Sequence, residues 1–166
     1  MVSLTCGNPA FSPEDFWYIK TVINFHLLNT YKMARTITQK IKFKNQKVSD
    51  LYAMFLESKS HRKITGGNAA KISAKEGARF TAHNGYCFGK NLQLVKNRLI
   101  VQSWRGSDWS GDDMDSTFIL SFSQHGRDAV LTMVHANVPD KQAAGVRSGW
   151  YDFYWKPWKE YLKSIG

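Results

Sequence analysis

Apolar residues in the last 28 residues recur at intervals of three or four, which is typical of one face of an α-helix. The stripe consists of Val146, Trp150, Phe153, Tyr154, Trp158 and Leu162. It predicts one long C-terminal helix that begins at Pro139-Asp140, with Tyr151, Trp155 and Lys159 off the stripe. Pro157 lacks a backbone donor and crowds the carbonyl of Phe153, so we expect a kink or a looser turn there.

Between residues 69 and 136 the apolar period changes to two, which predicts strands separated by turns. Asn84-Gly85 indicates a tight hairpin, because both central positions of a type I′ turn need a positive φ. Short loops of this kind force neighbouring strands to be antiparallel. We expect strands near Ala69–Ala74, Ala78–His83, Tyr86–Val95, Arg98–Arg105, Ser116–Ser123 and Asp128–Ala136.

A further strand and two short helices are expected before this meander. Arg35–Lys44 alternates apolar and polar residues, and Val48–Ser58 has a helical face that Ser49 or Asp50 can cap. Ser60–Thr65 adds a short helical turn. The order is that of an α+β fold: an antiparallel sheet of about six to seven strands whose face is covered by the C-terminal helix.

The first 33 residues differ from the rest and allow two interpretations. Ser12-Pro13-Glu14-Asp15 followed by Phe16, Ile19, Ile23 and Leu27 is compatible with an extra helix over residues 13–31. Alternatively, Met33 is the natural start, the upstream residues are an extension, and the domain covers residues 34–166.

Composition limits the class of protein but does not select a partner. The net charge is +10, and the first 33 residues hold two charges of each sign, so the whole excess lies downstream. A basic surface permits acidic proteins, anionic membranes or nucleic acid, but no stacking aromatics accompany the lysines, which makes nucleic-acid binding the weakest of these. Two cysteines, Cys6 and Cys87, make no disulfide framework, and neither a membrane span nor a signal peptide is predicted. We expect a cytoplasmic protein.

Five segments together resemble the START-like (SRPBCC) superfamily, specifically the branch similar to the C-terminal domain of the Hsp90 ATPase activator Aha1. They are TITQKIKFK, VSDLYAMFLES, RLIVQSWRGSDW, DSTFILSFSQHGRDAVLTMVHANVP and GWYDFYWKPWKEYL, and they span Thr36 to Leu162. The resemblance implies a helix-grip fold, in which a curved antiparallel sheet wraps the C-terminal helix with room for an apolar cavity. Members of this superfamily include lipid and hormone carriers, cyclases and chaperone activators. Eukaryotic Aha1 also has a separate N-terminal domain, which residues 1–33 do not resemble.

Such a cavity would be lined by apolar residues of the sheet and the last helix, or these residues would simply fill the core. The candidate ligand-binding residues are Phe80, Tyr86, Phe88, Trp104, Phe118, Leu120, Phe122, Met133, Trp150, Phe153 and Tyr154.

No pattern indicates a metal, a cofactor or a phosphate site. The histidines at positions 26, 61, 83, 125 and 135 form no metal-ligand spacing. The acids of the loop Gly106–Asp115 lack the order of a calcium loop, and we expect a solvated, mobile segment near the cavity mouth that would suit a lid.

Three functional hypotheses follow. The first is a non-enzymatic START-like domain that binds a small hydrophobic or amphipathic ligand. The second is a protein-interaction module linked to a chaperone, which uses its basic surface against an acidic partner. The third is a small-molecule cyclase or hydrolase, for which His135, Tyr86 and Asp115 are the candidate groups.

Overall fold

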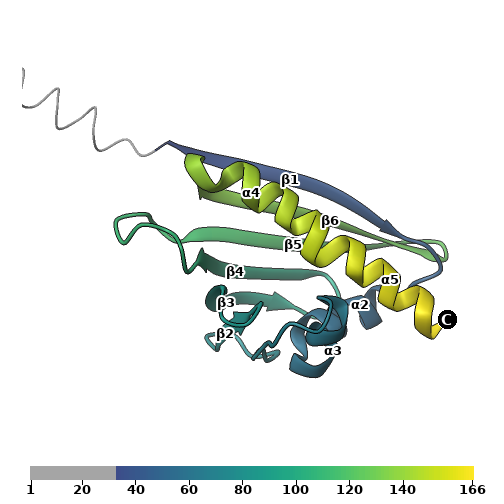
Figure 1. Ribbon diagram of the computed structural model, residues 1–166. Helices are drawn as coiled ribbons and strands as arrows, with labels where there is room; N and C mark the ends of the chain where they lie inside the picture. Colours follow the sequence, from purple (N-terminus) through teal and green to yellow (C-terminus); the bar gives the residue numbers. More distant parts are fainter. Residues whose placement is uncertain (1–32) are drawn as a thin grey trace, which may run out of the picture. The chain divides into compact units, whose positions relative to one another are not determined.

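The computed structural model describes residues 33–166, in which strands of one antiparallel sheet are followed by a C-terminal helix that lies along one face of that sheet (Figure 1). The strand order is β1-β6-β5-β4-β3-β2. The elements are β1 (Ala34–Phe43), α2 (Val48–Leu56), α3 (Ser58–Ile64), β2 (Arg79–Ala82), β3 (Cys87–Val95), β4 (Leu99–Gly106), β5 (Ser116–His125), β6 (Asp128–Pro139), α4 (Asp140–Trp150), η1 (Tyr151–Trp155) and α5 (Lys156–Ile165). This is the predicted α+β helix-grip fold.

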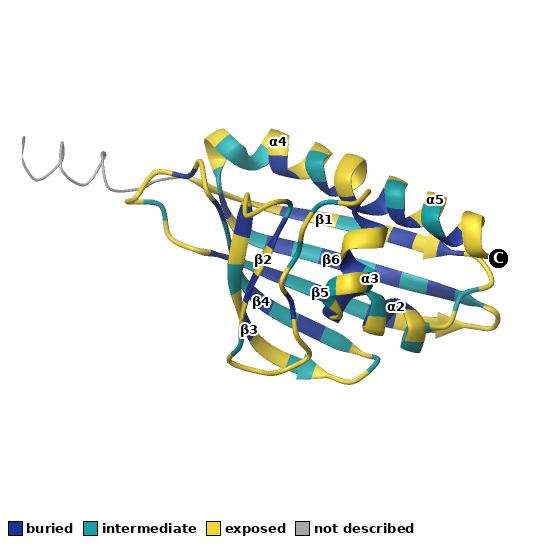
Figure 2. Ribbon diagram, turned by 60° about the horizontal axis from the view of Figure 1, so that its bottom comes forward, coloured by how far each residue is buried: buried dark blue, intermediate teal, exposed yellow. Residues whose placement is uncertain are grey.

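The alternation along the strands separates a buried face from an exposed one. On β5, Phe118, Leu120 and Phe122 are buried while the residues between them are partly exposed. On β4, Ile100, Gln102 and Trp104 are buried in the same way. The helices lie on one face of the sheet (Figure 2), and Phe118 of β5 packs against Phe55 of α2 and Trp150 of α4. The core therefore lies between the sheet and the α2–α3 and α4–α5 layer.

Phe55 of α2 lies at the centre of this core. Its ring is stacked on that of Phe118 with centroids 5.7 Å apart, and it lies 6.2 Å from the rings of both Tyr154 and Trp158. One side chain of the first helix therefore joins the sheet to the C-terminal helix.

The C-terminal helix contains a π turn, η1, where the sequence predicts a looser turn. The Lys156 N–H donates to the carbonyl of Tyr151, five residues earlier. Pro157 follows directly, and it cannot donate to the carbonyl of Phe153 as an α-helix would require. The irregularity predicted at Pro157 thus lies in the turn immediately before it.

The π turn reverses the predicted burial of Phe153 and Trp155. The ideal helical spacing places Phe153 on the buried stripe and Trp155 off it, whereas in the structure Trp155 is 3% exposed and Phe153 is 58% exposed. The prediction for these two side chains is wrong, because a π turn holds one more residue than an α turn and rotates the segment about the helix axis.

Two other local predictions need correction. Residues 69–74 form no strand; only Lys71 makes an isolated bridge, to Thr81. Helix α2 has no side-chain cap from Ser49 or Asp50. Instead, the Val48 N–H donates to Oε1 of Gln124 at 3.0 Å, a partner 76 residues away on β5.

The hairpin predicted at Asn84-Gly85 is confirmed, although its loop is longer than two residues. Strand β2 ends at Ala82 and β3 begins at Cys87. His83, Asn84 and Gly85 all have positive φ. The helix predicted over residues 13–31 lies outside the described residues. No helix within residues 33–166 is long and apolar enough to cross a membrane.

Candidate functional site

A cavity of about 350 Å³ lies between the C-terminal helix and the β2–β3 hairpin. Its walls come from α4 and η1 on one side and from the hairpin and β4 on the other. The lining residues are Asn68, His83, Tyr86, Cys87, Trp104, Gly145, Val146, Gly149, Trp150, Phe153 and Tyr154. Because aromatic and apolar groups dominate this list, the cavity has the character of a small-molecule site.

Two glycines on α4 leave room for the cavity. Gly145 and Gly149 are one helical turn apart and both line it. A Cβ atom added at Gly145 would meet no atom within 4 Å, and one added at Gly149 would lie 3.6 Å from the Phe153 ring. The helix therefore presents bare backbone to the cavity where other residues would extend side chains into it.

The aromatic wall is built on Trp150. Its ring stacks on Phe118 with centroids 4.6 Å apart and lies 4.5 Å from the Tyr154 ring. Trp104 contributes from β4, with its centroid 6.2 Å from that of Trp150. Trp150 is 3% exposed, so a ring fixed by the core forms one surface of the cavity.

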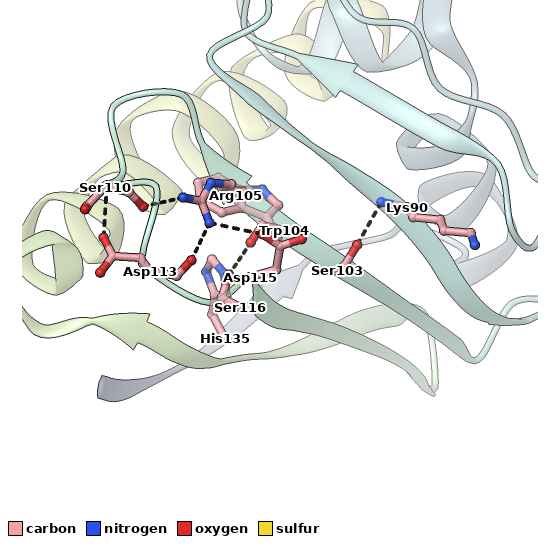
Figure 3. A network of polar contacts seen from close by, with 9 residues as sticks. All are labelled: Lys90, Ser103, Trp104, Arg105, Ser110, Asp113, Asp115, Ser116 and His135. Atoms are coloured by element: carbon pink, nitrogen blue, oxygen red, sulfur yellow. Dashed lines mark hydrogen bonds and ion pairs between the residues drawn. The ribbon is translucent and has the colours of Figure 1, made fainter. Parts of the chain in front are cut away.

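A chain of hydrogen bonds behind this wall holds both tryptophans. Trp150 Nε1 donates to His135 Nδ1 at 3.0 Å, so His135 carries its proton on Nε2 and donates it to Ser116 Oγ at 2.7 Å. Ser116 Oγ in turn donates to the carbonyl of Trp104 at 2.7 Å (Figure 3). Burial lowers the pKa of His135 to about 3, which keeps its ring neutral.

His135 therefore positions the wall. Both of its ring nitrogens are occupied by protein groups, it is fully buried, and it is not among the lining residues. Neither nitrogen is free to exchange a proton with a bound molecule, which argues against the acid or base role considered above for this histidine.

The polar groups at the cavity are uncharged at neutral pH. Burial raises the pKa of Cys87 to about 11 and that of Tyr154 well above its usual value, and the two side chains meet with Sγ and Oη 3.9 Å apart. Burial lowers the pKa of His83, and burial followed by the charge of Asp108 raises the pKa of Tyr86 to about 12. A neutral ligand suits this environment, because none of the lining residues would carry a charge at neutral pH to pair with an ion.

One buried polar atom of the lining residues has no hydrogen-bond partner among residues 33–166. Nε2 of His83 is buried, and no hydrogen-bond partner for it lies in the described part of the chain. The His83 ring packs edge-on against Tyr154 with centroids 4.8 Å apart, which fixes its orientation. Buried polar atoms are usually satisfied, which makes the unpaired nitrogen of this lining residue unusual.

The loop between β4 and β5 is mostly exposed, as expected for a solvated segment, but it is also anchored to the domain by Arg105 and Trp109. Arg105 donates to the carbonyls of Ser110 and Asp113 and pairs with Asp115 (Figure 3). Trp109 is 6% exposed and packs 5.4 Å from Trp104. The sequence shows the acids of this loop but not that Arg105, on the preceding strand, contacts them. For this reason the anchoring of the loop was not predicted. Residues 33–166 contain no cluster of His, Cys, Asp or Glu suited to a metal ion.

The structure brings together five of the eleven residues proposed as ligand-binding. Tyr86, Trp104, Trp150, Phe153 and Tyr154 line the cavity. Five others are buried in the core away from it, and Phe88 is 38% exposed on the side of β3 opposite Cys87; the buried five are Phe80, Phe118, Leu120, Phe122 and Met133.

Sequence reasoning missed His83, Asn68, Cys87, Gly145, Val146 and Gly149. The glycines carried a usable signal: Gly145 and Gly149 are four residues apart, beside Val146 and Trp150 of the apolar stripe. Two glycines on the inner face of a helix indicate either a cavity or the close approach of another part of the chain.

A curved antiparallel sheet that holds a C-terminal helix, with a cavity between them, defines a START-like helix-grip domain. Residues 45–163 match the family described as Activator of Hsp90 ATPase homolog 1-like protein, and the chain belongs to this family.

Similar proteins agree with this assignment. An uncharacterized protein of Schizosaccharomyces pombe is 30% identical over 114 residues, 67% of this chain and 32% of the relative. The activator of 90 kDa heat shock protein ATPase homolog of Dictyostelium discoideum is 24% identical over 75% of this chain and 33% of its own length. The chain thus spans about a third of the curated relatives that it matches.

Solved structures show the same fold. An HSP90 activator from Plasmodium falciparum superposes with a TM-score of 0.68 at 22% identity, over 79% of this chain and 96% of that one. CalU16 from Micromonospora echinospora gives a TM-score of 0.62 at 20% identity, over 80% of this chain and 76% of the other.

Proposed function

We propose that this domain binds a small, uncharged, largely aromatic molecule in the cavity between α4, η1 and the β2–β3 hairpin. One observation carries the proposal: a volume of about 350 Å³ has an aromatic wall and is lined by His83, whose buried Nε2 has no hydrogen-bond partner within residues 33–166. The ring nitrogen would orient the ligand through one hydrogen bond, and the wall would supply most of the affinity.

The physical basis is burial of apolar surface. Removing apolar surface from water contributes about 25 cal/mol per Å², and offset or edge-to-face packing on Trp150 and Tyr154 adds to this for an aromatic ligand. Because Trp150 is held by Phe118 and His135, the wall needs no rearrangement before binding. A preorganised wall avoids the ordering cost that weakens many binding sites.

A substitution at position 145 can abolish ligand binding without lowering the stability of the fold, so the two effects can be measured separately. Gly145→Leu puts a side chain into space that is open within 4 Å, and it replaces a helical glycine by a better helix former. We expect the stability to be unchanged or raised by about 0.5–1 kcal/mol, while the uncharged fluorescent probe N-phenyl-1-naphthylamine loses its binding. Probe fluorescence and thermal unfolding measure the two quantities.

The matched control is Ala144→Leu, which adds a leucine to the same helix at a residue that does not line the cavity. It should bind the probe as the unchanged protein does, and native mass spectrometry should show any co-purified molecule in this control but not in Gly145→Leu. Equal probe binding by both variants, or no binding by the unchanged protein, would contradict the proposal.

We also propose a second candidate function, the stimulation of ATP turnover by an Hsp90-type chaperone. It is favoured by the similarity to Hsp90 ATPase activators of Dictyostelium discoideum and Plasmodium falciparum. The basic surface of this chain would attract an acidic partner, so stimulation should weaken as salt is raised. ATP turnover of purified Hsp90 with increasing amounts of the domain measures the effect, and an unchanged rate at saturation would exclude it.

A further inference from the structure

A second hollow, of about 640 Å³, lies at the C-terminal half of α5, beside the end of β1. It shares no residue with the aromatic cavity. We call it the basic groove, and its lining residues are Lys42, Phe43, Lys44, Asn45, Gln46, Lys159, Leu162, Lys163 and Gly166. We propose that the basic groove binds an acidic, extended segment of a partner protein. The inference does not rest on either proposed function.

Four lysines line the groove. Lys42 and Lys44 come from the end of β1 and the residue after it, and Lys159 and Lys163 come from α5. All four are exposed. Within residues 33–166, Lys42 Nζ lies 2.7 Å from Asp128 Oδ2, and Lys44 also attracts this carboxylate. One carboxylate thus faces two of the four lysines, which leaves the groove with an excess of positive charge.

The spacing of the two lysines on α5 matches an extended peptide. Residues four apart on a helix, such as Lys159 and Lys163, are separated by about 6 Å along the axis. Alternate side chains of an extended peptide repeat at about the same interval of 6.7 Å. Carboxylates at alternate positions of such a peptide would meet both lysines.

The groove is built before any partner arrives. Its floor consists of Phe43 and Leu162, which are 2% and 8% exposed, and Lys159 Nζ lies 5.8 Å from the centre of the Phe43 ring. The loop after β1 is fixed to the β5–β6 hairpin, because Gln124 Nε2 donates to the Gln46 carbonyl at 3.1 Å and the Asn45 N–H donates to Asp128 Oδ1 at 2.9 Å.

The surroundings favour a peptide over a nucleic acid. Strand β1 is at the edge of the sheet, and within residues 33–166 no strand pairs with its outer side. This edge offers backbone hydrogen-bonding groups to an extended peptide. Single-stranded nucleic acid is bound through exposed aromatic rings on which bases stack, and the aromatic ring of the groove, Phe43, is buried in its floor.

The test uses the full chain and a fluorescein-labelled peptide of alternating glutamate and threonine, about twelve residues long so that it exceeds the length of β1. Fluorescence anisotropy should show binding that weakens with added salt. The variant Lys159→Glu/Lys163→Glu should weaken binding about tenfold or more, because two attractive charges become repulsive. Lys159→Arg/Lys163→Arg, which keeps both charges, should bind within a few-fold of the unchanged protein.

The matched control is Lys75→Glu/Lys96→Glu, which makes the same change in net charge at two exposed lysines outside the groove. It should lose much less affinity than the groove variant, and Lys44→Glu should reproduce part of the loss from β1. The β1 lysine Lys42 could have another role, because lysines on an edge strand discourage pairing between copies of a chain. Absence of peptide binding, equal losses in the groove and control variants, or tighter binding of an oligothymidylate of equal charge would each overturn the proposal.

Discussion

Gly89 shows how much a single residue decides about the contact between neighbouring strands. A Cβ atom at this position would lie 1.9 Å from the backbone oxygen of Ser103 and 3.0 Å from the ring of Phe80. Backbone atoms cannot give way as the end of a flexible side chain can. Strand β3 therefore needs glycine here to remain paired with β4.

We expect Gly89→Ala to destabilise the protein by about 1–3 kcal/mol, the usual range for overpacking. Gly111→Ala is the control, since a Cβ atom there would meet nothing within 4 Å and the φ of Gly111 is not positive. Urea unfolding of both variants measures the difference. Equal stability of the two would show that the sheet can shift to make room.

Two buried histidines make the stability depend on pH. Burial lowers the pKa of His135 to about 3 and that of His61 to about 4, whereas a histidine in the unfolded chain has a pKa of about 6.5. The unfolded state therefore binds more protons between these values. Stability should be fully present above pH 6.5 and should fall as the pH falls towards 3, by up to about 1.4 kcal/mol per pH unit for each histidine.

The variant His135→Gln tests this assignment. It should cost about 1–3 kcal/mol at pH 7 through the lost bonds to Ser116 and Trp150. More specifically, its stability should fall less steeply between about pH 6 and about pH 4.5 than that of the unchanged protein. Urea titrations at several pH values give both slopes, and parallel slopes would mean that His135 does not contribute.

At the scale of elements, the π turn decides which aromatic residues of the C-terminal helix hold the sheet. Trp155 packs between Trp150 and Trp158, at centroid distances of 5.6 and 6.3 Å, and its indole nitrogen donates to the side chain of Gln39 on β1. Phe153 is more than half exposed at the rim of the cavity. The two side chains thus have opposite roles two residues apart.

We expect Trp155→Ala to destabilise the protein by about 3–5 kcal/mol, as truncation of a buried aromatic residue does. Phe153→Ala should cost less than about 1 kcal/mol, because an exposed ring buries little apolar surface. Thermal or urea unfolding ranks the two. A larger loss at position 153 would mean that the segment is a regular α-helix with the ideal stripe facing inward.

At the scale of the whole molecule, residues 33–166 supply the strands β1 to β6, the helices α2 to α5 and the lining of the cavity. We expect a protein that begins at Met33 to fold independently and to unfold at the same temperature as the full chain. Circular dichroism and a thermal melt of the two proteins provide the comparison. A fall of several degrees in the shorter protein would show that residues 1–32 contribute to the stability of the domain.

Much of this architecture could be predicted because it depends on local patterns. Alternation of period two located β1 to β6, the helical period located the C-terminal helix, and Asn84-Gly85 located a hairpin. These signals arise from the regular backbone geometry of helices and strands, whose side-chain periods do not depend on tertiary contacts. The Ala69–Ala74 segment shows their limit: an alternating pattern does not make a strand where only one residue, Lys71, finds a bridging partner.

The sequence by itself determined the α+β order, the antiparallel meander, the aromatic C-terminal helix and the family resemblance, because each is encoded in the spacing of neighbouring residues. Only the tertiary structure decided which aromatic residues face a cavity, that Trp155 rather than Phe153 is buried, and that Gln124 caps α2. It also decided that His135 links Trp150 to Ser116. These contacts join residues distant in the chain, and no local period specifies the rotation of a helix or the partner of a buried polar atom.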